Sequence, residues 1–133
     1  LALGLAIQKT GLANAAADGI ISLADGDVYL NLILLYLATI ILTESITNNA
    51  AIVIAFPIAQ ELSLALDASL LPFLMAIMFG ASMSFLTPFG YQTNLMVQGP
   101  GRYKAADYLK VGIPLSILCS IVVIALIPLI WPF

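Results

Sequence analysis

The chain has 133 residues, of which 62% are hydrophobic and 8% are charged, with a formal net charge of −3. Soluble domains carry about 25% charged residues, so this composition excludes an ordinary soluble domain and predicts an all-α integral membrane protein. One cysteine and no histidine exclude an intrachain disulfide, histidine-based catalysis and the usual zinc sites.

Residues 1–24 mix apolar side chains near helical spacing with several glycines and a few polar residues. We predict a helix that lies along the membrane interface. The alternative is the tail of a preceding span followed by a connection. Because the chain starts at Leu1 without a basic leader, we interpret it as the C-terminal piece of a larger polypeptide.

Residues 28–62 form two apolar arms around one polar cluster, T-E-S-I-T-N-N. The arms, Val28–Leu42 and Ala50–Leu62, would be roughly 22 and 20 Å long as helices, against a hydrocarbon core of about 30 Å. Arms too short to cross alone predict a re-entrant hairpin whose tip stops near the membrane midplane. Polar groups at that depth need surrounding protein or a water-filled cavity, which is typical of a transport site.

Residues 69–98 predict a broken span. The apolar run Ser69–Phe85 is followed by T-P-F-G-Y-Q-T-N and then by a short apolar piece. A proline and a glycine so close together, followed by polar residues, break a helix. We therefore expect a helix, an unwound stretch over Thr87–Asn94 and a half-helix. Ser82 and Ser84 are interpreted as packing residues that allow close helix contact.

Residues 108–132 predict the last span. Three of the four basic residues lie within 102–110, so the positive-inside rule makes this loop cytoplasmic. Trp131 and Phe133 then form an aromatic anchor on the extracytoplasmic side. Following the chain back from this loop through the broken span places both ends of the hairpin on the extracytoplasmic side, with its tip directed toward the cytoplasm.

The two polar interruptions fall at similar membrane depth. Backbone carbonyls of an unwound stretch, together with Asn and Thr oxygens, are ligands for Na⁺, and a half-helix N-terminus suits an anion. Asn48 and Asn94 are predicted to approach one cation, roughly 5 Å apart. Glu44 has three open roles: a buried ligand, a proton carrier or an acceptor for free N–H groups. Asn, Ser and Thr also serve as plain interhelical contacts in membranes.

These residues carry a resemblance to a known family. Thr43–Asn49 resembles the T-E-x-x-S-N-T hairpin tip of the divalent anion:sodium symporters, within the ion transporter superfamily. Pro88–Asn94 and the G-P-G at Gly99–Gly101 are similar to that family's P-x-G-T-P-P-N and G-x-G. The chain is most like bacterial permeases with TrkA-C domains, and the resemblance covers it as the second inverted repeat.

The resemblance implies sodium-coupled uptake of an anion by elevator-like alternating access in the cell membrane. It implies five substrate-binding residues: Thr47, Asn48, Asn49, Gln92 and Thr93. It implies five sodium ligands, some through backbone carbonyls: Thr43, Ile46, Asn48, Gly90 and Asn94. The expected partners are the bilayer, the N-terminal half of the same transporter and a second copy in a homodimer, with no nucleic acid and no cofactor beyond Na⁺ as coupling ion.

The substrate class stays open between sulfate, another divalent oxyanion and a dicarboxylate. The family's S-N-T triplet and paired prolines are replaced here by Thr47–Asn49 and by Gln92-Thr93, which slightly favours a compact oxyanion such as sulfate. Two alternatives remain: an antiporter or arsenite-type exporter of the same superfamily, and a structural or channel-forming subunit. The paired breaks count against the subunit, and the lack of any catalytic constellation counts against an enzyme.

Overall fold

The computed structural model describes residues 2–133, and every regular element in that part of the chain is an α-helix. This confirms the predicted all-α class. The elements are α1 (Ala2–Lys9), α2 (Leu12–Ala24), α3 (Val28–Ser45), α4 (Asn48–Ala65), α5 (Leu70–Ala81), α6 (Gln92–Gly101) and α7 (Ala105–Ile130).

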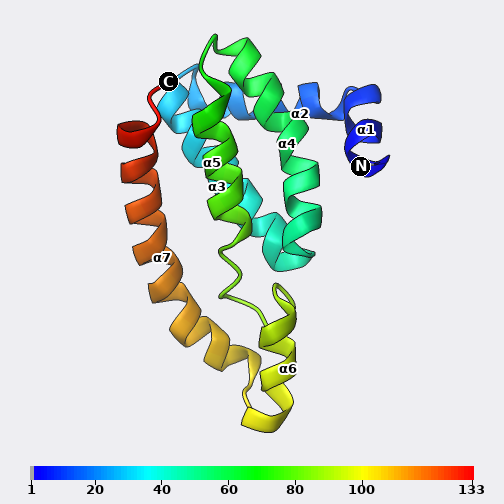
Figure 1. Ribbon diagram of the computed structural model, residues 1–133, viewed down its shortest axis with the longest axis vertical. Coiled ribbons are helices and arrows are strands. Elements are labelled where there is room, and N and C mark those ends of the chain that lie inside the picture. Colours follow the sequence, from blue (N-terminus) through cyan, green and yellow to red (C-terminus); the bar gives the residue numbers. More distant parts are fainter. Residues whose placement is uncertain (1) are drawn as a thin grey trace.

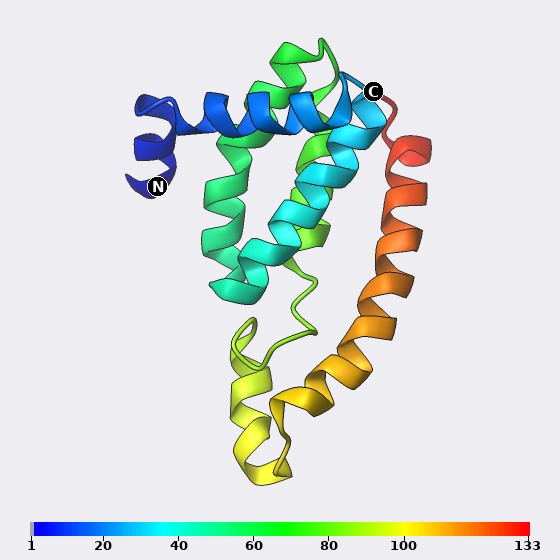
Figure 2. The same cartoon turned by 180° about the vertical axis from the view of Figure 1, so that it is seen from behind.

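α1 and α2 replace the single N-terminal helix that the sequence predicted over residues 1–24. Gly11 separates them because it adopts a left-handed φ of 73°, which favours glycine. α2 lies across one end of the longer helices (Figures 1 and 2). Gln8 of α1 donates to Gln60 of α4 at 3.0 Å, so this N-terminal pair is tied to α4. Leu1 lies outside the described residues.

α3 and α4 form a helical hairpin joined only by Ile46 and Thr47. Its two open ends lie at the same end of the molecule, and its tip lies near the middle (Figures 1 and 2). Thr47 starts α4 as its N-cap by accepting a hydrogen bond from the Ala50 N–H at 3.3 Å. The position of this hairpin relative to a membrane stays a prediction.

The hairpin arms are longer than the sequence predicted, and for α3 the argument that the arm is too short to span was wrong. α3 and α4 have 18 residues each, or about 27 Å. α3 and α7 are both long and apolar enough to cross a membrane, with mean hydropathies of 1.7 and 2.8. Polarity does not end α3 because hydroxyls can bond within a helix: Ser45 Oγ donates to the Ile41 carbonyl at 2.9 Å.

α5 packs against both arms of the hairpin and completes the core. Gly80 allows the close approach to α3, since a Cβ there would lie 3.1 Å from the Tyr36 carbonyl oxygen. The largest fully buried side chains are Leu32, Leu35, Tyr36, Leu62, Phe73, Ile77 and Ile127. This core fixes the ends of α3, α4 and α5 that carry the polar residues.

Where the broken span was predicted, the structure has a helix, an unwound stretch and a second helix, with other boundaries; that these segments span a membrane stays a prediction. α5 ends at Ala81 rather than Phe85, because the N–H groups of Ser82 and Met83 turn back to carbonyls three residues earlier. α6 begins at Gln92 rather than at Leu95. Polar residues can begin a helix because the first N–H groups need no acceptor within it.

α7 starts at Ala105, three residues before the predicted 108, and ends at Ile130. The earlier start follows from a cap: Asp107 Oδ2 accepts the Lys104 N–H at 2.7 Å. α7 runs from the α6 end of the molecule back to the open end of the hairpin (Figure 1). Near the middle of both helices, Tyr36 OH lies 3.1 Å from Ser120 Oγ, which joins α3 to α7.

Candidate functional site

Asn48, the first residue of α4, is surrounded by oxygen atoms from three segments. One end of its amide lies 2.6 Å from Thr43 Oγ1 and 2.8 Å from Ser84 Oγ. Thr43 Oγ1 also lies 2.6 Å from the carbonyl oxygen of Ala81. With its nitrogen at that end, the Asn48 amide donates to the Gly90 carbonyl at 3.2 Å. These five residues form the oxygen cluster; Thr43 is 0% and Ser84 4% exposed, so the cluster is shielded from bulk water.

Glu44 ties the hairpin tip to the unwound stretch between α5 and α6. Its Oε1 accepts from the Leu86 N–H at 2.8 Å, and its Oε2 accepts from the Thr87 N–H at 3.0 Å and the Thr87 hydroxyl at 2.8 Å. These amides have left the helix and lack an acceptor four residues earlier. Of the three roles left open by the sequence, these contacts match the acceptor for free N–H groups.

A polar pocket of about 270 Å³ lies between the hairpin tip and the start of α6. It is lined by the first residues of two helices and by the loop before the second: Thr47, Asn48, Asn49, Phe89, Gly90, Tyr91 and Gln92. The N-termini of α4 and α6 therefore border one cavity, and no side chain caps α6. Helix N-termini offer unpaired N–H groups and partial positive charge, so this polar pocket suits a small anion.

A second pocket, of about 300 Å³, is bordered by both predicted anchors, Asn48 and Asn94. The two residues meet at Ser84. Asn48 bonds its hydroxyl, and the Asn94 amide nitrogen donates to its carbonyl oxygen at 2.8 Å. Asn94 also donates to the Thr87 carbonyl at 3.3 Å. Its nitrogen therefore holds the unwound stretch in place.

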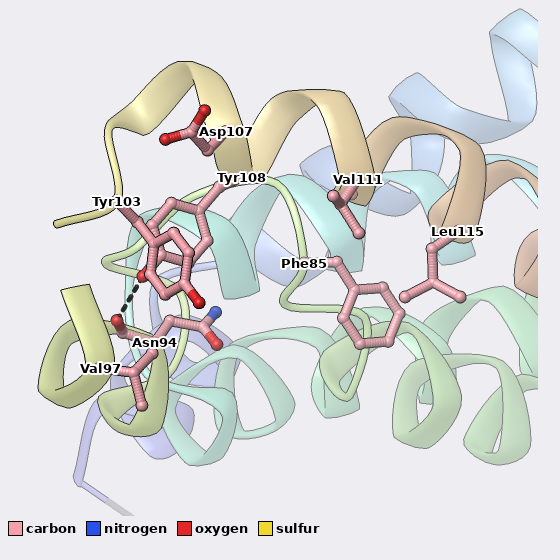
Figure 3. A pocket seen from close by; sticks show the side chains of 9 residues that line it. Phe85, Asn94, Val97, Tyr103, Asp107, Tyr108, Val111 and Leu115 are labelled. Carbon is pink, nitrogen blue, oxygen red and sulfur yellow. Dashed lines mark hydrogen bonds between the residues drawn. The ribbon is translucent and has the colours of Figure 1, made fainter. Parts of the chain in front are cut away.

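A third pocket, of about 330 Å³, lies between α6 and α7 beside the same asparagine. Figure 3 shows Tyr108 of α7 with its hydroxyl directed at the Asn94 backbone; it donates to that carbonyl oxygen at 2.6 Å. Phe85 faces Val111 and Leu115 across the apolar part of the pocket. α7 thereby fixes where α6 begins.

The structure brings together most of the residues singled out from the sequence. Thr43, Asn48 and Gly90 share the oxygen cluster, and the polar pocket holds the rest of the proposed anion set except one. That one is Thr93, which is exposed in the first turn of α6 and lines neither polar cavity. Ile46 ends α3 with its N–H bonded to the Leu42 carbonyl at 2.9 Å, so only its backbone carbonyl is available as a ligand.

Ser84 was interpreted as a packing residue, and that interpretation was wrong. Its hydroxyl contacts Asn48 and its carbonyl contacts Asn94. Thr87, whose hydroxyl bonds Glu44 and accepts the Gly90 N–H at 3.1 Å, was also missed. The position of Ser84 and Thr87 in the chain could have revealed both residues. A hydroxyl just past the end of a helix has lost the helical carbonyl to which it would otherwise bond.

Comparison with known proteins places the chain in a family. A family model described as "Citrate transporter" matches residues 1–133. The chain belongs to the citrate transporter family. This confirms, at the level of the family, the resemblance drawn from the hairpin tip and the broken span. Members of the citrate transporter family are transporters and not enzymes, and with the apolar helices α3 and α7 this makes the chain part of a membrane protein.

Several relatives of this citrate transporter family chain are similar over most of its length. An uncharacterized transporter of Synechocystis sp. is 39% identical over 133 residues, covering 97% of this chain and 21% of the relative. Sodium/sulfate cotransporter 2 of Chlamydomonas reinhardtii is 43% identical over 122 residues, or 88% of this chain and 14% of the relative. Solute carrier family 13 member 1 of Mus musculus is 32% identical over 111 residues, which cover 84% of this chain and 19% of the relative. The chain thus spans about a fifth or less of these relatives.

Proposed function

We propose that this chain is one repeat of a sodium-coupled anion symporter and that the transported anion is sulfate or another divalent oxyanion. The oxygen cluster supplies the cation ligands, and the polar pocket beside it receives the anion. Asn48 borders both, which makes it the shared residue. The names of the sodium/sulfate relatives support the coupling ion and the substrate class.

The observation that carries this proposal is the meeting of two helix N-termini at one polar pocket, directly beside a buried group of neutral oxygens. Cation and anion can then bind at adjacent positions and neutralise each other. A proton antiporter would instead need a carboxyl group free to titrate. Glu44 is already bound to two backbone N–H groups, which argues against antiport.

The membrane arrangement is part of the same proposal. The hairpin α3–α4 enters and leaves on the extracytoplasmic side, α5 and α6 form the broken span, and α7 crosses completely. The N-terminal half of a longer transporter covers the remaining faces of the two pockets, and the complete protein acts as a homodimer in the cell membrane. Alternating access then moves the site as a unit between the two sides.

The test is uptake of labelled sulfate by proteoliposomes that contain the longer transporter. An inward sodium gradient should stimulate uptake, and replacement of sodium by choline should abolish the stimulation. Unlabelled citrate and succinate serve as competitors, because the family description names citrate. Uptake of labelled citrate with no uptake of labelled sulfate would change the substrate class, and equal uptake in sodium and choline would contradict sodium coupling.

Alanine substitution of Asn48 or Asn94 tests the placement of the site. Each change removes a half-buried polar group, with an expected cost of about 1–3 kcal/mol. The sodium concentration for half-maximal uptake should rise several-fold, and anion affinity should fall with it by linkage. The control is Ser45→Ala, whose exposed hydroxyl bonds only within α3. Unchanged sodium dependence in both asparagine variants would refute this placement.

A further inference from the structure

The amide of Asn48 points one of its ends into a space that is crowded with oxygen atoms. Four oxygens surround this inner end: Thr43 Oγ1 at 2.6 Å, Ser84 Oγ at 2.8 Å, the Ala81 carbonyl at 3.0 Å and the Gly90 carbonyl at 3.2 Å. Two of them are hydroxyls and two are carbonyls, which carry no hydrogen. An amide oxygen and an amide nitrogen have nearly the same size and differ in what they offer to these neighbours.

Counting hydrogens separates the two orientations of the amide. With the nitrogen inward, two N–H and two O–H hydrogens serve four oxygen acceptors, so each oxygen can accept one hydrogen. With the oxygen inward, five oxygens share only the hydroxyl hydrogens of Thr43 and Ser84. The Ala81 and Gly90 carbonyls then face Asn48 Oδ1 at 3.0 and 3.2 Å without a hydrogen between them. In this shielded place such contacts are unfavourable.

A cation reverses this preference, because it replaces the missing hydrogens with positive charge. Around a hard cation held about 2.4 Å from each ligand, neighbouring oxygens stand about 3.4 Å apart. The oxygens now lie 2.6 to 3.2 Å from the inner end of the amide. Binding of sodium therefore requires these separations to widen by about 0.2 to 0.8 Å, with the amide oxygen turned inward as a ligand.

We propose that the Asn48 amide turns over when sodium binds, and that Ser84 Oγ holds it in both orientations. The hydroxyl of Ser84 accepts from the amide nitrogen in the cation-free site and donates to the amide oxygen in the cation-bound site. This proposal rests on the proposed function and assigns Ser84 a positioning role in it. A hydroxyl suits this role because it can donate and accept.

The rotation couples the cation to the anion. When the amide oxygen points into the oxygen cluster, the amide nitrogen points away from it, toward the polar pocket that Asn48 also lines. The pocket then gains an N–H donor beside the N-termini of α4 and α6. Without sodium the same place is taken by a carbonyl oxygen, which repels an anion. Sodium and the anion therefore raise each other's affinity.

The experiment uses the longer transporter, purified and free of anion. Sodium binding is measured as the rise in melting temperature with added sodium chloride against choline chloride, and anion binding as retention of labelled sulfate with and without sodium. In the wild type, sodium should stabilise the protein without sulfate, and sulfate should bind only with sodium. Absence of sodium-promoted sulfate binding in the wild type would overturn the proposed function itself.

Asn48→Asp tests the rotation, because aspartate presents oxygen at both ends. The variant should keep stabilisation by sodium and lose sulfate binding. Sulfate binding within twofold of the wild type would overturn the rotation, and so would loss of the sodium response, since the inward oxygen is retained.

Ser84→Ala tests the positioning role of the hydroxyl. The sodium concentration for half-maximal stabilisation should rise roughly 5- to 30-fold, the range expected for one buried polar contact. Saturating sodium should restore sulfate binding, which a merely unfolded variant would not recover. Ser45→Ala, whose hydroxyl bonds its own helix, should match the wild type. An unchanged sodium midpoint in Ser84→Ala would overturn the role of Ser84 while leaving the proposed function intact.

Discussion

Glu44 links the hairpin tip to the broken span through one half-buried carboxylate. It accepts the backbone N–H groups of Leu86 and Thr87, which would otherwise be unpaired in a membrane. Glu44→Ala should destabilise the protein by about 2 kcal/mol or more, because each unpaired backbone group costs about 1–3 kcal/mol. Glu44→Gln keeps one acceptor oxygen, so its stability should lie between that of the wild type and that of Glu44→Ala. Thermal unfolding in detergent measures this, and a wild-type melting temperature for Glu44→Ala would contradict the role.

Gly90 leaves no room for a side chain beside that carboxylate. A Cβ there would lie 2.7 Å from Glu44 Oε2 and 3.2 Å from the Ser84 Cβ, so Gly90→Ala must displace one of them. We expect a lower melting temperature and a higher sodium half-saturation concentration for uptake. The matched control is Gly99→Ala, because a Cβ at Gly99 meets nothing within 4 Å. Equal behaviour of the two variants would show that this contact is unimportant.

Residue types predicted the location of the site better than they predicted individual contacts. The polar tip and the Pro-Gly break led to Asn48, because polar groups deep in an apolar chain must gather, and the family resemblance of these motifs implied Thr43 and Gly90. Ser84 was missed because its contact depends on the path of a stretch that follows no helical repeat. Thr93 was included with Gln92 because the resemblance implies both positions, but adjacent residues on a helix point in different directions.

At the scale of elements, hydrogen bonding set the helix boundaries, whereas the sequence interpretation used polarity. α3 continues through Thr43–Ser45, and α6 begins with Gln92, although both segments are polar. In α3 the backbone finds its acceptors within the helix, and the first N–H groups of α6 have no partner in the helix whichever side chains they carry. The order and kind of the elements could be predicted from apolar runs and turn signals. The exact ends depended on tertiary contacts, such as Glu44 with Thr87, which no local pattern contains.

Tyr108 makes the position of α6 depend on α7. Its hydroxyl donates to the Asn94 carbonyl at 2.6 Å, in the first turn of α6. Tyr108→Phe should cost about 0.5–1.5 kcal/mol and raise the sodium half-saturation concentration modestly, because Asn94 holds the unwound stretch. Tyr103→Phe, on the rim of the same pocket, keeps the ring and is the control. If both variants transport like the wild type, α6 is positioned without this bond.

At the scale of the whole molecule, the chain presents two distinct ends. The turn before α3, the α4–α5 loop and the C-terminus lie at one end, and the loop between α6 and α7 lies at the other (Figures 1 and 2). The sequence predicted this grouping from the hairpin and from the basic residues of the last loop. It did not predict that α2 lies across the open end, because that depends on contacts between α2 and both hairpin arms.

Single cysteines in a Cys119→Ala background test the orientation in intact cells that carry the longer transporter. Cysteines at Asp25, Asp67 and Phe133 should react with an impermeant thiol reagent from outside, because all three sit at the end opposite the basic loop. A cysteine at Lys104 should react only after the membrane is opened, since Lys and Arg favour the cytoplasmic side.

Two results of this labelling would each remove one part of the membrane arrangement. If Asp25 and Asp67 react from opposite sides, the hairpin crosses the membrane and does not return. A polar tip at mid-depth would then be lost, together with the reason for expecting a shielded cation site there. If Lys104 reacts from outside, the hairpin geometry stands but the chain is inverted. The assignment of the α6–α7 loop to the cytoplasmic side from its basic residues would then be wrong.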